Sequence, residues 1–466
     1  MSVLPDRFLN KKHPHSAANA TSYVSRQVPL NVQKAPASTT INFRIGTQPN
    51  TFVDPSASFL RWKVTNKSTT CDFTLGSAGA PALFETINLL NSGSQLSHYQ
   101  NYGVFRSMKN CVNATADWTN GPGAIMQGTG PALSDNVGRS GETIVKSTAT
   151  VQSSRVFIDP ICNHTSLFNC GKMISLDTID NLDLRYTIGD YTYGGAWSSE
   201  VDGGAADGGT LGAAALAGLN DQSIEFSDFE LCLACVQLDS GTASQLRAAH
   251  PDGNICYECR GIGRVASTIP AGVSAHNVNL GLGYSSLMAL NAVQLPLKKG
   301  TAQTDSIARV SDHNNSTFVK NFLSKHIFLL DGAPVENLRH IKGDPAEIAA
   351  FQQIATGNFH KFSGAVIDGS SSLAALSNDT ESLAVLSGKK GYVLSQELCI
   401  YKQKAGHWAD SEMSVMCEGR GTLASSTQLN LEFGPNSGAE VQLEVFPEYR
   451  QLIVLDNNTK TYRVSQ

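Results

Sequence analysis

The sequence contains the same β-rich pattern twice, half a chain apart. It reads TINLLNSGSQLSHYQNY near position 90 and HIFLLDGAPVENLRHIK near position 330. Each stretch has an apolar segment that ends in Leu-Leu (Leu89-Leu90 and Leu329-Leu330), a polar turn, and a second short segment leading into a helix-like stretch. A turn dipeptide such as Asp-Gly between apolar runs is typical of a β-hairpin. The offset of 240 residues therefore predicts a β protein made of two similar halves.

Two further pairs of segments support a duplication. DNLDLRY (Leu182 to Tyr186) matches TQLNLEF (Leu429 to Phe433) at an offset of 247, and VQLDS matches IVLDN at an offset of 217. We assign the decrease of 30 residues to a Gly- and Ala-rich loop at 190–223, which has only a short counterpart in the second half. Chance is the alternative, because β proteins often reuse Leu-x-Leu strands. The preserved order of the three pairs favours duplication.

Composition limits the classes of protein to which the chain can belong. Its 466 residues exceed one ordinary domain, and only 16% of them are charged, against about 25% in typical globular proteins. Such a surface suits a protein that covers much of itself with partners. The net charge of −5 argues against a general nucleic-acid binder. The sequence contains no run of 18 apolar residues, so it predicts no membrane-spanning helix. It also has no apolar run of signal-peptide length near its start. We therefore expect the protein to be made and kept in the cytosol or nucleus.

The first 38 residues differ from the rest of the chain. They are polar and lack periodicity, and up to residue 40 their charge is +4, from five basic residues against Asp6 (Arg7, Lys11, Lys12, Arg26, Lys34). We predict a flexible basic arm at 1–38. It could clamp neighbouring proteins or serve as a solubilising tail, and its charge is too small to condense DNA.

From residue 39 onward the dominant signal is the period-two alternation of half-buried strands. It predicts strands at 41–45, 60–64, 155–158, 182–188, 229–238, 255–260, 276–282, 287–295, 326–330, 392–401, 414–417, 429–433 and 451–455. Helices are expected only at 99–112, 242–251 and 344–357, the last beginning with a capping box after Asp344.

Short strands, polar turns and few helices predict an all-β fold of the sandwich or barrel kind. Each half is long enough for an eight-stranded jelly roll, so we expect two tandem eight-stranded jelly rolls, a double jelly roll, with a few short helices. The expected division is an arm at 1–38, a first roll at 39–240 with its long loop at 190–223, a connecting helix at 241–253 and a second roll at 254–466.

Four of the ten cysteines have the spacing of a zinc site: Cys232, Cys235, Cys256 and Cys259. However, Cys232 and Cys235 lie on a predicted strand, where positions three apart point to opposite faces. Zinc requires its thiolates to converge. We therefore favour reduced core cysteines, with a zinc site or a disulfide as alternatives.

No catalytic, cofactor-binding or metal-binding residues can be nominated from the sequence, so we expect that the protein is not an enzyme. Ser387-Gly388-Lys389-Lys390-Gly391 lacks the upstream glycine and the final Ser or Thr of a phosphate-binding loop. The pairs Gly261/Gly263 and Gly281/Gly283 lie among strands without a following helix, and Gly-x-Ser-x-Gly and His-Glu-x-x-His are both absent.

The strand–turn–strand–helix units at 86–108 and 326–354, and the closing strands FELCLACVQLD and YRQLIVLD, resemble the double jelly-roll major capsid proteins of the adenovirus, tectivirus, virophage and polinton-like virus lineage. The resemblance covers roughly residues 39–466 and rests on architecture. It implies a homotrimer with six jelly rolls in a pseudo-hexagon, assembling into an icosahedral capsid around double-stranded DNA.

The resemblance also implies partners and a location. The partners are other copies of the chain, neighbouring capsomers and minor capsid or penton proteins, with weak genome contact through the arm; the location is the virion, assembled in host cytoplasm or nucleus. Tyr191, Tyr193 and Trp197 in the long loop would anchor in a neighbour, and the apolar run at 213–219 would be covered; a mobile surface loop is the alternative. Other candidate functions are a viral spike or vertex protein and a tandem β-sandwich lectin or carbohydrate-active protein.

Overall fold

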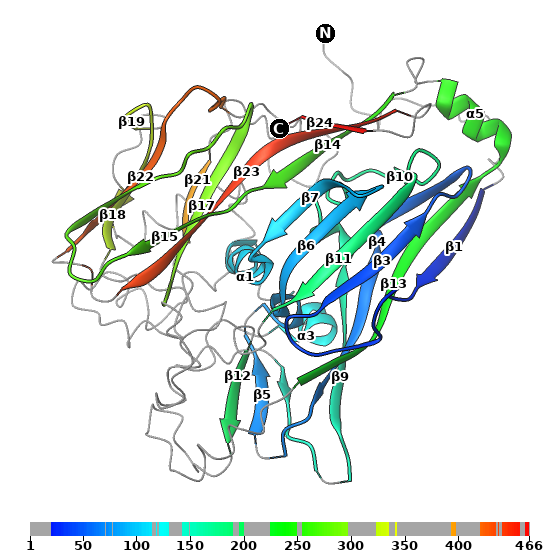
Figure 1. Cartoon of the computed structure of the whole chain (residues 1–466), viewed down its shortest axis with the longest axis horizontal. Helices are drawn as coiled ribbons and strands as arrows, with labels where there is room; N and C mark the ends of the chain where they lie inside the picture. Colours follow the sequence, from blue (N-terminus) through cyan, green and yellow to red (C-terminus); the bar gives the residue numbers. More distant parts are fainter. Residues whose placement is uncertain are drawn as a thin grey trace.

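The computed structural model shows two β-sandwiches of matching topology. It describes residues 20–69, 71–76, 78–113, 118, 121–129, 142–148, 150–189, 195–199, 224–248, 254–296, 323–334, 341–342, 393–397, 420–434, 437, 440–456 and 462–465. Figure 1 shows the first sandwich on the right and the second at the upper left, with helix α1 (Tyr102–Asn113) between them. Among the described residues, no helix is long and apolar enough to cross a membrane.

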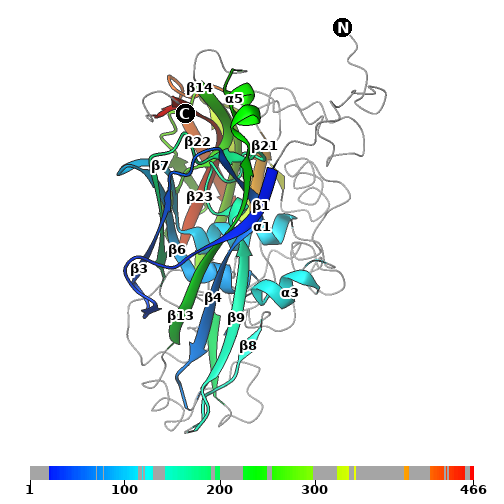
Figure 2. The ribbon, with the colours of Figure 1, turned by 90° about the vertical axis from the view of Figure 1, so that its right-hand side faces the viewer.

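The first sandwich consists of two antiparallel sheets whose strand order defines a jelly roll. One sheet runs β1 (Ala20–Gln27), β13 (Ile224–Leu238), β4 (Thr51–Asn66), with β9 (Ser153–Pro160) also paired to β4. The other runs β3 (Thr40–Gly46), β11 (Asn181–Ile188), β6 (Phe84–Asn91), β7 (Ser94–Gln100). Figure 2 shows the two sheets facing each other. Short strands extend the first sheet: β2 (Lys34–Ala35) and β10 (Ile174–Ser175).

The second sandwich repeats this order. Its six-stranded sheet runs β14 (Asn254–Ile262), β23 (Val441–Asp456), β17 (Leu287–Pro296), β21 (Val393–Glu397), with β15 (Val265–Ile269) and β24 (Tyr462–Ser465) also on β23. Its other sheet runs β16 (Ala275–Asn279), β22 (Thr427–Phe433), β18 (Leu323–Leu330), β19 (Ala333–Pro334), with β20 (Ile341–Lys342) on β18. Eight strands in each half match strand for strand, so the predicted pair of jelly rolls is confirmed.

Smaller elements decorate the first roll. A third sheet consists of β12 (Gly195–Ser199), β5 (Cys71–Leu75) and β8 (Thr143–Ile144). Helix α3 (Pro122–Gln127) and the short 3-10 helices η2 (Ala80–Leu83) and η3 (Ile161–Asn163) complete it. Helix α5 (Ser240–Ala248) follows β13, two residues earlier than predicted, because Asp239 accepts the backbone N–H groups of Gly241 and Thr242 and so caps its start.

Each roll encloses an apolar core. Strict alternation buries one face of β11 (Leu182, Leu184, Tyr186), and Trp62 lies at the centre of the first core, 5.2 Å from the ring of Phe84 and 6.2 Å from that of Phe157. The core of the second roll contains side chains such as Leu290, Leu431 and Leu443.

Two predicted elements, the strand at 414–417 and the helix at 344–357, lie outside the described residues.

The repeated hairpins are equivalent, but with a register different from the predicted one. Ser92 and Gly93 have φ of 47° and 88°, and Asp331 and Gly332 have 52° and 76°, so each pair forms the same two-residue turn with both residues left-handed. These turns are 239 residues apart, so Leu89 corresponds to Phe328 rather than Leu329. A slip of one residue exchanges the two faces of a strand, and Leu89 and Phe328 are the buried side chains.

The predicted arm at 1–38 is wrong for residues 20–35. Eight residues of this stretch form β1, which pairs along its whole length with β13, and Lys34–Ala35 form β2. The first roll therefore starts at β1 and not at residue 39. Polar residues dominate β1 and most of its side chains are exposed, so it lacks the alternation by which the other strands were recognised.

Candidate functional site

The candidate site is the interface between the two rolls, where helix α1 and edge strand β7 of the first roll meet β14 and β23 of the second. The Phe105 ring on α1 lies 5.6 Å from the Phe446 ring on β23. The core of the first roll continues across the interface into apolar side chains of the second (Tyr257, Cys259, Val293, Leu295, Phe446, Ile453, Leu455). Burial of a shared core holds two domains in one orientation.

A buried carboxylate lies at the centre of this interface. Glu448 of β23 is 2% exposed. Lys109 of α1 donates to its Oε1, Asn291 of β17 donates to the same oxygen at 2.7 Å, and Arg260 of β14 donates to Oε2 at 3.1 Å. Burial acts to raise the pKa of Glu448, but Lys109 and Arg260 outweigh it and lower the pKa to about 2. Glu448 therefore stays ionised and ties the first roll to the second through Lys109.

This carboxylate predicts that acid weakens the interface. The ordinary pKa of a glutamate is 4.5 and that of Glu448 is about 2, so its contribution is complete above pH 4.5 and is lost as the pH falls towards 2. A depression of this size corresponds to about 3 kcal/mol. We expect the difference in free energy of unfolding between the wild type and Glu448→Gln, measured by urea titration, to shrink as the pH is lowered from about 6 to about 2. A difference independent of pH would contradict the assignment.

A second buried carboxylate on β23 has a partner in its own roll. Glu444 is fully buried, and Arg264 donates to both of its oxygens, at 2.6 and 2.7 Å. A bidentate arginine–carboxylate pair of this kind fixes the relative orientation of the two side chains as well as balancing their charges. It holds the chain between β14 and β15 against β23 at the edge of the interface.

Two glycines allow aromatic rings to lie flat at the same edge. The rings of Tyr284 and Tyr449 stack with centroids 4.0 Å apart. A Cβ on Gly261 would come within 2.4 Å of the Tyr449 ring, and one on Gly263 within 2.3 Å of the Tyr284 hydroxyl. The Gly261/Gly263 pair is thus required by packing, and it lies among strands as predicted, with Gly261 in β14 and Gly263 directly after it.

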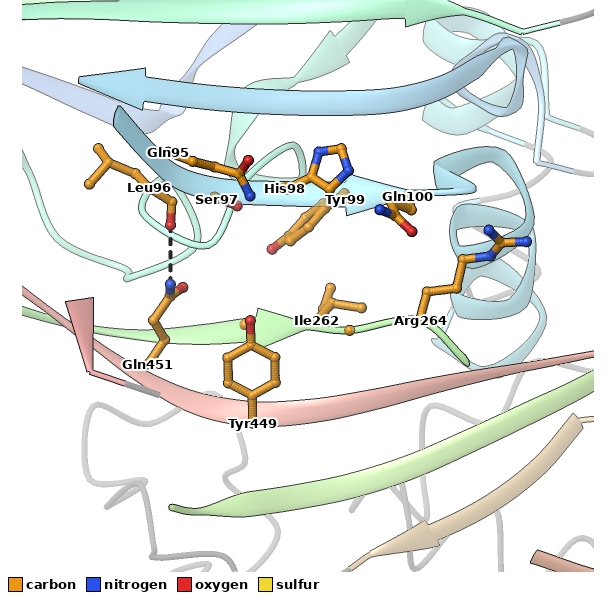
Figure 3. Close-up of a pocket in the computed structure, with 12 residues that line it drawn as sticks. Gln95, Leu96, Ser97, His98, Tyr99, Gln100, Ile262, Arg264, Tyr449 and Gln451 are labelled. Carbon is orange, nitrogen blue, oxygen red and sulfur yellow. Dashed lines mark hydrogen bonds between the residues drawn. The ribbon is translucent and has the colours of Figure 1, made fainter. Parts of the chain in front are cut away.

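A hollow of about 240 Å³ separates β7 from the second roll. Figure 3 shows the β7 residues Gln95 to Gln100 along one side, and Ile262, Tyr449 and Gln451 along the other. The Gln451 side chain crosses to donate to the carbonyl oxygen of Leu96 at 3.1 Å. Elsewhere in the interface, the backbone N–H of Ser175 donates to the Tyr257 hydroxyl at 3.0 Å. Hydrogen bonds and apolar contacts thus both join the rolls.

The four cysteines with zinc-like spacing lie on two strands of different sheets. Cys232 and Cys235 are on β13 and Cys256 and Cys259 on β14, all as free thiols, with Cys256 exposed and the other three buried. Burial raises the pKa of Cys232, Cys235 and Cys259, which favours neutral thiols over the thiolates that zinc binds. Within the described part of the chain, no three His, Cys, Asp or Glu residues are grouped so as to hold a metal ion.

The long loop of the first roll is described only at β12. Trp197 there pairs with Phe73 of β5 in the same chain, so the backbone at this position already has a partner strand. Tyr191, Tyr193 and the run at 213–219 lie outside the described residues. Sequence reasoning missed the site itself, because Glu444, Pro447 and Glu448 interrupt the apolar pattern of β23. A signal for the interface was present in the sequence: Glu444 and Glu448 lie among large apolar residues, and the structure buries both faces of this part of β23.

Comparison with solved structures identifies the fold. The chain is similar to a protein of the Sputnik virophage structure, at 11% identity with a TM-score of 0.59, covering 100% of this chain and 92% of that one. It is similar to the PBCV-1 virus capsid, at 11% identity and a TM-score of 0.57 over 98% and 99% of the two chains. It is also similar to the Faustovirus major capsid protein, at 10% identity and a TM-score of 0.57 over 97% and 93%.

The chain has the double jelly-roll fold of these viral proteins. No family model and no curated protein matches the sequence. The fold is therefore shared over nearly the whole length of the chain, while about nine residues in ten differ.

Proposed function

We propose that the protein is a major capsid protein, which self-assembles as a trimeric capsomer into an icosahedral shell around a double-stranded DNA genome. The observation that carries the proposal is the pair of matching jelly rolls, locked side by side through the Glu448 interface. Capsid proteins are among the solved structures with the same fold over nearly the full chain length. This likeness supports the capsid proposal over a lectin, a carbohydrate-active protein or a spike.

The proposed role is structural rather than enzymatic. The polar groups of the interface are engaged with each other: the Glu448 carboxylate with Lys109, Arg260 and Asn291, and Glu444 with Arg264. The Lys109–Glu448 contact joins the two rolls and holds their orientation, and the Arg264–Glu444 pair holds the edge of the second roll beside it. The proposed location is the virion, after assembly in the cytoplasm or nucleus of a host.

Further partners follow from this role. We propose that neighbouring capsomers and minor capsid or penton proteins contact the trimer. With Arg26 in β1 and Lys34 in β2, the basic residues left for weak genome contact are Arg7, Lys11 and Lys12, against Asp6. Three cations give at most a weak, salt-sensitive attraction to DNA.

The mass and shape of the purified protein test the proposal. Three chains of 49.7 kDa give a particle of about 149 kDa. We expect native mass spectrometry to find this mass and negative-stain microscopy to show hexagonal plates. A monomer of 49.7 kDa that binds glycans on an array would overturn the proposal in favour of the lectin alternative.

A further inference from the structure

One oxygen of the buried Glu448 carboxylate accepts hydrogen bonds from a lysine of the first roll and an asparagine of the second. The Nζ of Lys109 on α1 and the Nδ2 of Asn291 on β17 both donate to Oε1, the asparagine at 2.7 Å. Two nitrogens that contact the same oxygen lie within about 5 Å of each other. A primary amine, a carboxamide and a shared carboxylate are the groups that can form an amide bond between two side chains.

The positions of these residues in their elements bring them together. Lys109 follows Phe105 by four residues and lies on the same face of α1, which meets the Phe446 ring. Glu448 follows Phe446 by two residues and lies on the same face of β23. Asn291 pairs with Phe446 in the register of β17 and β23, so its side chain points to that face as well. All three groups therefore lie beside the contact between the two phenylalanine rings.

Water has little access to the carboxylate and the amide. Glu448 is 2% exposed, Asn291 is 7% exposed and the Lys109 side chain is 25% exposed. The Lys109 Nζ also lies 5.7 Å from the centroid of the Phe105 ring. Transfer of one proton from Lys109 to Glu448 converts the ion pair into a free amine and a carboxylic acid. Burial favours neutral groups over charged ones, so this site favours the nucleophilic amine more than bulk water does.

We propose that Lys109 and Asn291 form an isopeptide bond that joins the two rolls covalently. The Lys109 Nζ attacks the Cγ of Asn291 and forms a new C–N bond, and the bond from Cγ to Nδ2 breaks. Glu448 acts as general base and then as general acid, since its Oε1 contacts both the attacking and the leaving nitrogen. Nζ gives up two protons, the amide nitrogen leaves with both of them as an ammonium ion, and Glu448 returns to a carboxylate.

Arg260 slows this reaction. Its guanidinium lies 3.1 Å from the other oxygen of Glu448 and stabilises the ionised carboxylate. A carboxylate with a pKa of about 2 is a weak base, so the bond forms slowly. Freshly purified protein therefore contains the ion pair, and the bond accumulates with time. The bond lies within one chain, so the inference goes beyond the proposed capsid function and does not depend on it.

Mass spectrometry of the full chain tests the bond after incubation for several days. We expect the intact mass to fall by about 17 Da, the mass of ammonia. Trypsin should no longer cleave after Lys109, and it should release one branched peptide in which residues 107–139 are joined to residues 265–298. An unchanged mass, or a loss of ammonia without this branched peptide, would overturn the inference.

Three variants separate the chemistry from the packing, with circular dichroism to verify that each is folded. Lys109→Arg keeps a cation beside Glu448 but lacks a primary amine, and Glu448→Gln removes the proton carrier, so neither should yield the branched peptide. Asn291→Asp should yield it with loss of water, about 18 Da, in place of ammonia. Lys325→Arg, in the half-exposed pair with Glu432, is the control and should react as the wild type does. Formation of the branched peptide at the wild-type rate in Glu448→Gln would refute the role assigned to Glu448.

Discussion

Glu448→Ala lowers the free energy of unfolding by about 3–5 kcal/mol and loosens the two rolls from each other. The substitution removes the buried carboxylate that Lys109, Arg260 and Asn291 share, so two cations, with side chains 25% and 39% exposed, lose their common counter-ion. Loss of one member of a buried ion pair costs more than the pair itself contributes, because the remaining charge lacks its counter-ion. The measurement is urea denaturation, followed by hydrogen exchange along α1 and β23.

Glu432→Ala is the matched control for this experiment. Glu432 lies in β22 of the same roll and pairs with Lys325 at 3.1 Å, but both side chains are 41% exposed. A surface pair of this kind contributes about 0–1 kcal/mol. The interface role of Glu448 fails if the two alanine variants lose the same stability, or if exchange in α1 is unchanged in Glu448→Ala.

The fold could be predicted from the sequence where one face of a strand is apolar and the other polar. β3, β11 and β22 bury every second side chain, and all three were located within about two residues. The register of the repeat was harder to predict. Leu-Leu occurs at both hairpins, but the turn residues Ser92 and Asp331 set the true correspondence, and a one-residue slip leaves the sequence match looking almost as good.

The remaining features depend on tertiary neighbours that a local pattern does not contain. β1 is a strand because β13 offers it a hydrogen-bonding edge, and its own sequence, ATSYVSRQ, is mostly polar and exposed. The duplication could have predicted β1. The predicted strand at 255–260 of the second roll had no counterpart in the predicted first roll, and β1 is that counterpart. Glu444 and Glu448 are buried because residues distant in the sequence pack against them. Arg264 pairs with Glu444, and Lys109 of the first roll pairs with Glu448.

Asp159→Ala should destabilise the first roll as strongly as Glu448→Ala does the interface. Asp159, at the end of β9, and His164, which follows η3, are both fully buried, and the Asp159 Oδ2 lies 2.8 Å from His164 Nε2. Gln127 of α3 donates to Oδ1 at 2.6 Å, and Arg106 of α1 lies 3.5 Å from the same oxygen. The carboxylate thus joins two helices to the sheet, and without it the Arg106 cation remains in the core with no counter-charge from Asp159.

The expected loss is about 3–5 kcal/mol in the free energy of unfolding, measured by urea denaturation of the full chain. Asp159→Asn should lose less, because the amide oxygen still accepts from Gln127 while its NH₂ group faces His164. Asp183→Ala is the surface control: its partner Arg44, at 2.8 Å, has a side chain 52% exposed, and solvent replaces the lost contact. The central role of Asp159 is refuted if its alanine variant is no less stable than that of Asp183. A confirmed ranking would show that this buried polar network, and not apolar packing alone, fixes α1 in the position from which it meets the second roll.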